Sequence, residues 1–178
     1  MFSVKPDGSD PVQLSPPRLS IIDLGFFDRV GVDWSPDGSR VAFAALKSGG
    51  RFTTALFLVN ADGTGLRQIT PSGVGALSAQ WSPNGALIAF TSGCCGFPQA
   101  WVVYPDGSGL RRVTRPVDGA IFWTPVWSPD STKLLIDRQD RRNGRTSLWT
   151  VNTDGSRLFK LADTESLSIY AWGSAPAD

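Results

Sequence analysis

The chain has 178 residues, of which 41% are apolar, so it carries enough apolar side chains for the core of one domain. Its 17 Lys and Arg against 16 Asp and Glu leave a net charge of +1, without the basic surplus of a general nucleic-acid binder. Histidine is absent and Glu165 is the single glutamate, which excludes Ser-His-Asp triads, His-ligated metals and paired-glutamate glycosidase sites.

The N-terminal residues 1–28 are predicted to hold two short strands, 1–4 and 11–15, followed by a link. The strands flank the turn sequence Lys5-Pro-Asp-Gly-Ser. No basic start precedes an apolar stretch, so this chain shows no secretory signal, and no apolar run is long enough to span a membrane. Because the same turn recurs downstream, we interpret residues 1–28 as the last two strands of an incomplete repeat unit.

Three similar units follow, at residues 29–70, 76–114 and 121–162. Each starts with a predicted strand that ends in Trp and continues into a turn such as Trp34-Ser-Pro-Asp-Gly-Ser. Residues 167–178 contain an incomplete fourth copy of this motif, at Trp172. The intervals between the successive tryptophans Trp34, Trp81, Trp127 and Trp172 are 47, 46 and 45 residues. Pro and Asp suit the centre of a type I turn, and Gly takes the left-handed position that follows. Ser131 replaces this Gly in the third copy, which predicts a slightly strained turn.

A second turn motif lies inside each unit, as in Asn60-Ala-Asp-Gly-Thr-Gly-Leu-Arg. Short apolar runs such as 41–46 and 56–59 separate the turns and show no apolar–polar alternation. Strands that are buried on both faces have no reason to alternate. The 19 Gly and 13 Pro interrupt every window long enough for a helix. A period near 45 residues with such turns is typical of four-stranded propeller blades.

The predicted fold is therefore all-β, a β-propeller of four-stranded antiparallel blades with about four blades present. Residues 1–178 form a single propeller domain or a fragment of one, in which 167–178 supply the first strand of the incomplete blade. The two chain ends could combine to close a small four-bladed ring. Alternatively, the chain is an arc of a larger ring, which self-association could complete. We favour the arc, because four-bladed rings are rare.

The segment 34–43, its copies and the Asp-Gly motif that continues into Leu-Arg-Gln-Ile-Thr resemble the WD-repeat-like units of the TolB β-propeller family. The resemblance covers nearly all of the chain. It implies a bacterial propeller that is exported to the periplasm or the cell exterior and that binds other proteins. Related blades also accompany the hydrolase domain of prolyl-oligopeptidase-like peptidases.

If the strands of a blade are lettered A to D, the A–B and C–D turns lie on one face of the propeller. The B–C loops and the links between blades lie on the other face and differ between units, as binding loops on a rigid scaffold do. Aromatic and Arg side chains are the usual anchors of protein interfaces. We predict these partner-binding residues on the variable-loop face: Phe26, Phe27, Arg51, Phe97, Phe122, Trp123, Arg138, Arg141, Arg142 and Arg145.

We expect a non-catalytic scaffold that binds a protein partner, with no cofactor, metal, nucleic acid or membrane insertion. The alternatives are a carbohydrate-binding propeller, whose loop aromatics stack on sugars, and the accessory propeller of a prolyl-oligopeptidase-like peptidase. Phe122 and Trp123 have a second interpretation as core between blades, and residues 137–145 as a solvated hairpin tip. Cys94 and Cys95 are too few for a zinc site and are either two loop thiols or a strained disulfide.

Overall fold

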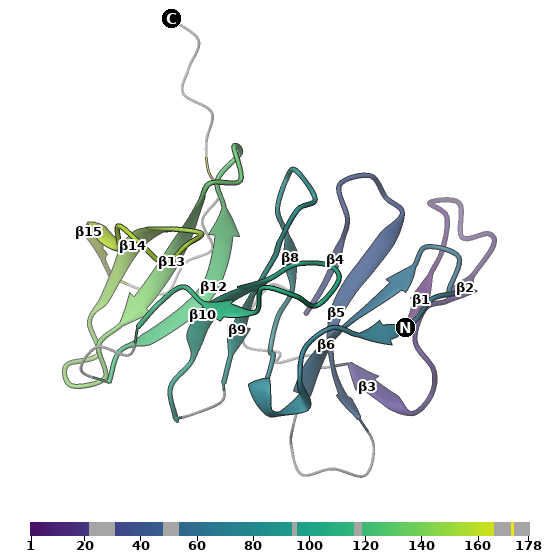
Figure 1. Cartoon of the computed structure of the whole chain (residues 1–178), viewed down its shortest axis with the longest axis horizontal. Coiled ribbons are helices and arrows are strands. Elements are labelled where there is room, and N and C mark those ends of the chain that lie inside the picture. Colours follow the sequence, from purple (N-terminus) through teal and green to yellow (C-terminus); the bar gives the residue numbers. More distant parts are fainter. Residues whose placement is uncertain (22–30, 48–53, 94–95, 116–118, 166–171, 173–178) are drawn as a thin grey trace, which may run out of the picture.

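The computed structural model describes residues 1–21, 31–47, 54–93, 96–115, 119–165 and 172. This described part contains the strands β1 to β15, and its one helical element is a short 3-10 turn, η1 (Ser72–Val74). The strands form antiparallel sheets that stand side by side in a row (Figure 1). The predicted all-β fold with four-stranded antiparallel blades is confirmed.

Three sheets contain four strands in chain order, each paired with its neighbour, and we call them the first, second and third blades. The first blade contains β4 (Val32–Trp34), β5 (Arg40–Lys47), β6 (Thr54–Asn60) and β7 (Arg67–Gln68). The second contains β8 (Gln80–Trp81), β9 (Ile88–Ser92), β10 (Gln99–Val103) and β11 (Arg111–Arg112). The third contains β12 (Ile121–Trp127), β13 (Lys133–Gln139), β14 (Thr146–Asn152) and β15 (Phe159–Thr164). Each blade's A strand ends at a repeat tryptophan, as the turn sequence predicts.

The N-terminal hairpin, β1 (Phe2–Ser3) and β2 (Val12–Gln13), is followed by a strand that the sequence analysis missed. This strand, β3 (Leu19–Ile21), lies in the segment interpreted as a link and pairs with residues 45–47 of β5. The strand β5 is eight residues long, whereas β4 pairs only with its residues 41–43. The rest of that edge would leave backbone N–H and C=O groups unpaired, and β3 pairs with them. The first blade therefore has a fifth strand.

The repeated A–B turns hold left-handed residues where the motif predicts them. Gly38 and Gly85 both have φ of 69°, and Ser131 has φ of 61°, so the expectation for Ser131 is confirmed. The Asp37 carboxylate accepts hydrogen bonds from the Ser35 hydroxyl and the Ser39 backbone N–H, which lower its pKa to about 2. The turn aspartates are therefore turn caps.

The C–D turns contain a second left-handed position that the sequence analysis did not identify. It follows the Asp-Gly pair, and its φ values are 51°, 66°, 62° and 53° at Asp10, Gly65, Gly109 and Arg157. Glycine adopts this conformation without steric cost, whereas Asp and Arg do not. Two of the four copies therefore carry local backbone strain at this position.

The core consists of clusters between neighbouring sheets. Alternate residues of β5 enter different clusters, because Ala42 and Ala44 pack toward the second blade and Val41 and Phe43 pack toward the N-terminal hairpin. A further cluster lies between the second and third blades. This burial of both faces explains why the strands lack alternation. The largest fully buried side chains are Phe43, Phe90 and Phe122, one in each blade.

Hydrogen bonds that involve the repeat tryptophans connect neighbouring units. The indole Nε1 donates to a backbone carbonyl of the preceding A strand, at 3.0 Å for Trp127 and 3.2 Å for Trp172. Between the first and second blades the bond is different. There the backbone N–H of Trp81 donates to the Asp33 carboxylate at 2.7 Å. The repeat tryptophans therefore hold neighbouring blades together.

We call the face that carries the A–B and C–D turns the turn face. On this face, arginines of the D strands connect neighbouring blades. The Arg67 guanidinium donates to the Pro105 carbonyl at 2.8 Å, and the Arg111 guanidinium donates to the Thr153 carbonyl at 3.1 Å. Each bond joins one blade to the C–D turn of the next. In the third blade Phe159 stands at this position of the motif, and its side chain is exposed.

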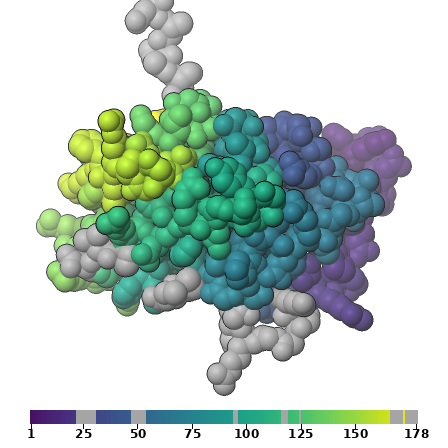
Figure 2. Space-filling view, in the orientation of Figure 1, coloured from purple at the N-terminus to yellow at the C-terminus, as the bar shows by residue number. Residues whose placement is uncertain are grey.

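The described blades stand in an open row (Figure 1). The hairpin β1–β2 packs against the first blade, whereas Trp172 is bonded to the third. These two regions lie at opposite ends of the row (Figures 1 and 2). The described residues therefore form an open row, and the arc of a larger ring stays a prediction.

Candidate functional site

The β13–β14 loop lies on the side of the row opposite to the A–B turns (Figure 1). Three of the predicted partner-binding residues, Phe26, Phe27 and Arg51, lie outside the described residues, and so do Cys94 and Cys95. The other seven candidates are all described, and they come from the second and third blades.

The β13–β14 loop is a well-defined hairpin tip. The Asp140 backbone N–H donates to the Arg145 carbonyl at 2.9 Å, and the Asp140 carboxylate accepts the Arg142 backbone N–H at 2.8 Å. The Asn143 Oδ1 accepts the Arg145 backbone N–H at 2.9 Å. Gly144 has φ of 71°, which suits glycine at the tightest point. Arg141, Arg142 and Arg145 are exposed, which fits both a solvated tip and a partner-binding surface.

The structure brings together two candidates from neighbouring blades. The guanidinium of Arg141, in the β13–β14 loop, lies 5.1 Å from the ring centroid of Phe97, in the β9–β10 loop. A cation–π contact at an exposed site contributes about 0.5–1 kcal/mol. The two loops therefore form one continuous surface that carries an aromatic ring and several arginines.

Phe122 and Trp123 point to opposite faces of β12. Phe122 is 1% exposed and packs between the second and third blades, so the prediction of a partner contact at Phe122 is corrected to a packing role. Trp123 is half-buried and lies opposite Asp137 in the β12–β13 pairing. Burial raises the pKa of Asp137 to about 6, and its Oδ1 has no hydrogen-bond partner among the described residues.

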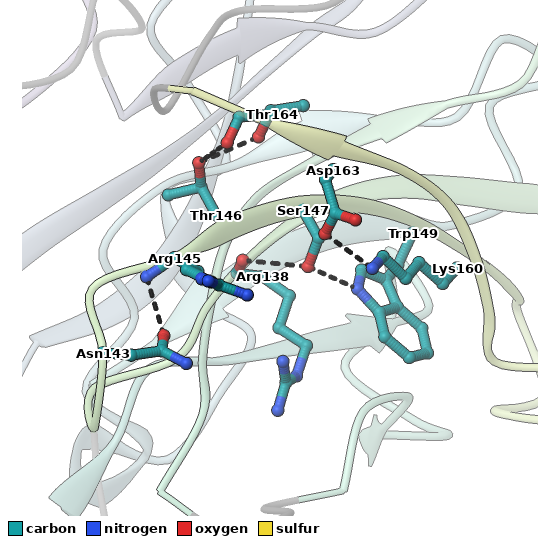
Figure 3. Close-up of polar contacts among 9 residues, drawn as sticks. All are labelled: Arg138, Asn143, Arg145, Thr146, Ser147, Trp149, Lys160, Asp163 and Thr164. Carbon is teal, nitrogen blue, oxygen red and sulfur yellow. Dashed lines mark hydrogen bonds and ion pairs between the residues drawn. The ribbon is translucent and has the colours of Figure 1, made fainter.

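A pocket of about 210 Å³ opens beside the β13–β14 hairpin. Figure 3 labels most of the residues that line it. Its lining is Arg138, Asp140, Asn143 and Arg145 from β13 and the loop, Ser147 and Trp149 from β14, and Lys160 and Asp163 from β15. We call it the arginine pocket. It contains two of the predicted binding residues, Arg138 and Arg145.

The contacts inside the arginine pocket fix most of its walls. The Lys160 ammonium pairs with the Asp163 carboxylate at 2.6 Å. The Trp149 indole N–H donates to the Ser147 hydroxyl oxygen at 2.9 Å, and the Arg138 guanidinium lies 5.6 Å from the Trp149 ring centroid. These contacts hold the ring and the guanidinium in defined positions.

The sequence analysis missed the part of the pocket that comes from β14 and β15, because it searched only loops. The sequence does contain a signal for this difference, at the threonine position that follows the first two D strands. Thr70 and Thr114 follow the D strands of the first two blades, and each side-chain hydroxyl accepts a backbone N–H of the C strand, at 2.9 Å and 3.0 Å. Ala162 stands at this position in the third blade and has no hydroxyl. Backbone pairing of Ala162 with Leu148 replaces the side-chain bond, so β15 extends to Asp163 and beyond.

Within the described residues, no group of three or more His, Cys, Asp or Glu side chains could hold a metal ion. The described part also has no helix with the length and apolar character that a membrane crossing needs.

The stacked antiparallel blades define the class of this protein as a β-propeller. The family model described as the TolB beta propeller domain matches residues 29–168. This match covers more than half of the chain, and the chain belongs to the TolB β-propeller family. The resemblance seen in the repeat motifs is thereby confirmed.

Curated relatives match part of the chain. It is similar to the Tol-Pal system protein TolB of Syntrophus aciditrophicus, with 34% identity over 90 residues that cover 50% of this chain and 18% of that protein. It is also similar to dipeptidyl-peptidase 5 of Porphyromonas endodontalis, with 32% identity over 108 residues that cover 59% of this chain and 15% of that protein. The matched segments are therefore less than a fifth of the length of these relatives.

Solved structures show the same fold at low identity. TolB from Agrobacterium tumefaciens superposes with a TM-score of 0.63 at 23% identity, covering 77% of this chain and 51% of that chain. An oligogalacturonate lyase from Vibrio parahaemolyticus gives a TM-score of 0.73 at 11% identity, covering 94% and 48%. At this identity the likeness extends to the fold alone.

Proposed function

We propose that this chain is a non-catalytic propeller module that binds a protein partner through its variable-loop face. The observation that carries the proposal is the contact of Arg141 with Phe97, because it joins the loops of two blades into one surface. Aromatic and Arg side chains are enriched at the energetically important centres of protein interfaces. The opposite, turn face consists of near-identical tight turns whose polar groups bond to one another.

Membership of the TolB β-propeller family supports this proposal, since one relative is named as a component of a Tol-Pal system. We place the protein in the periplasm or at the cell exterior on the same basis. The units at 29–70, 76–114 and 121–162, with parts of a further blade in 1–28 and 167–178, belong to one propeller domain or to a piece of one in this proposal. Self-association that completes a larger ring is compatible with it.

A second candidate function is the accessory propeller of a prolyl-oligopeptidase-like peptidase. The similarity to dipeptidyl-peptidase 5 favours it, as does the fold of an acylaminoacyl peptidase from Pyrococcus horikoshii, with a TM-score of 0.54 at 19% identity over 70% of this chain and 23% of that chain. In that case the gene should continue into, or adjoin, an α/β-hydrolase reading frame with a Gly-x-Ser-x-Gly motif. Sequencing the neighbouring gene region decides between the two.

The test is capture of a partner from an envelope extract of the source organism. The double variant Arg141→Glu, Arg142→Glu reverses two exposed charges beside Phe97 and should reduce the captured partner several-fold, as judged by quantitative mass spectrometry. Arg157→Glu is the matched control, because Arg157 is an exposed arginine on the opposite, turn face. Equal capture by all three proteins would contradict the proposal for this surface.

A further inference from the structure

The arginine pocket carries more positive than negative charge. The cationic side chains are Arg138, Arg145 and Lys160, and the carboxylates are Asp140 and Asp163. The 2.6 Å ion pair between Lys160 and Asp163 satisfies both of those charges. Two guanidiniums and one carboxylate remain, so the pocket has an excess of one positive charge.

The Arg138 guanidinium is positioned before a ligand arrives. Its central carbon lies over the Trp149 ring, 5.6 Å from the ring centroid, and the bond of the indole N–H to Ser147 fixes that ring. A cation–π contact does not consume the N–H donors of a guanidinium. Among the described residues, no hydrogen bond or ion pair uses these donors of Arg138.

The hairpin tip adds donors beside Arg138. Because the Asn143 Oδ1 accepts the Arg145 backbone N–H, its amide NH₂ is left as a donor. The Arg145 guanidinium likewise has no ion pair or hydrogen bond within the described part of the chain. In Figure 3, the Arg138 guanidinium lies between Asn143 and Trp149 in the view. Donors without acceptors of their own therefore come together in one small space.

We propose that the arginine pocket receives the carboxylate of an Asp or Glu side chain of the partner protein, an inference that rests on the proposed function. A guanidinium binds a carboxylate through two parallel N–H···O bonds, a geometry that Lys does not offer. The volume of about 210 Å³ is below the roughly 300–1,000 Å³ of pockets for drug-sized ligands and suits one side chain. The single excess positive charge matches one carboxylate.

Two other ligand classes fit this pocket less well. Arg138 lies over one face of Trp149, which leaves a stacking sugar at most the other face, and a neutral sugar does not balance the excess positive charge. A phosphate dianion carries two negative charges, whereas the pocket has an excess of one positive charge. The pocket therefore favours a monoanionic carboxylate.

The test is an NMR titration of the ¹⁵N-labelled chain with N-acetyl-glutamate α-amide, and with N-acetyl-glutamine α-amide as the uncharged control. The Trp149→Phe variant assigns the Trp149 indole signal. We expect this signal to shift with the glutamate probe, with a Kd of roughly 1–10 mM, typical of a single side chain. The glutamine probe should bind at least tenfold more weakly.

The principal variant is Arg145→Gln, because Arg145 is exposed and its change does not disturb the core. It should weaken glutamate binding at least fivefold, whereas Arg157→Gln on the turn face should leave it unchanged. Equal shifts with both probes, or unaltered binding by Arg145→Gln, overturn the proposal. If the titration succeeds but partner capture does not depend on Arg141, the proposed function fails alone. If capture depends on Arg141 but the titration shows no glutamate preference, the pocket proposal fails alone.

Discussion

The Asp33 carboxylate is the expected weak point of the junction between the first and second blades. At the other described junctions, a tryptophan indole donates to the preceding A strand. At this junction, the Trp81 indole N–H has no hydrogen-bond partner among the described residues, and the Trp81 backbone N–H donates to Asp33 at 2.7 Å instead. We therefore expect this charged hydrogen bond to contribute to the polar connection between the two A strands.

Replacement of Asp33 by Ala should cost about 2 kcal/mol of the free energy of unfolding, because it removes a bond to a charged acceptor and leaves a partly buried N–H without a partner. For a chain of this length the melting temperature should fall by about 4–8 °C. Asp33→Asn keeps an oxygen acceptor and loses only the charge, so it should cost about 0.5–1 kcal/mol.

Guanidinium unfolding followed by tryptophan fluorescence measures the free energy, and amide hydrogen exchange at Trp81 reports on the bond itself. The protection of the Trp81 amide should fall most in Asp33→Ala. The reasoning is refuted if Asp33→Ala costs less than about 0.5 kcal/mol, or if Asp33→Asn is as destabilising as Asp33→Ala.

Three further changes test other features. Arg157→Gly should raise stability by about 1 kcal/mol in thermal unfolding, because Arg157 holds a left-handed φ of 53° that glycine adopts freely; no gain would argue against strain there. Asp137→Asn should raise stability at pH 7.5 by about 1–2 kcal/mol and have little effect near pH 4. Burial raises the folded-state pKa to about 6, so the protein loses stability as pH rises from about 4 to 6; a pH-independent gain would contradict this. A double-mutant cycle of Phe97→Ala and Arg141→Ala should give a coupling of about 0.5–1 kcal/mol, and zero coupling would mean that the loops act separately.

The blades were predictable because turn chemistry is local. Ser-Pro-Asp-Gly selects its turn from four adjacent residues, and Ser131 shows that even the departure from the motif keeps the left-handed geometry. The absence of alternation in segments such as 41–46 correctly indicated burial on both faces. The strand β3 was not predictable from motifs, since it exists because β5 extends beyond the end of β4.

The site was predictable only in part. Arginine-rich composition drew attention to the β13–β14 loop, and two of its candidates, Arg138 and Arg145, line the pocket. The sequence allowed two interpretations of Phe122, a partner contact or core packing. The β12–β13 register places it opposite Arg138, on the face toward the second blade, where it packs in the core. Register depends on pairing between distant segments, and a shift of one residue would reverse the face of every side chain.

The repeat period and the turn residues predict a propeller from the sequence alone, because each unit encodes its own strands and turns within about 45 residues. The contact of Arg141 with Phe97, the extension of β15 past Ala162 and the meeting of Arg138 with Trp149 depend on the folded chain. Each of these joins segments of different strands or blades. Their geometry is set by packing of one sheet on the next, which no local motif contains.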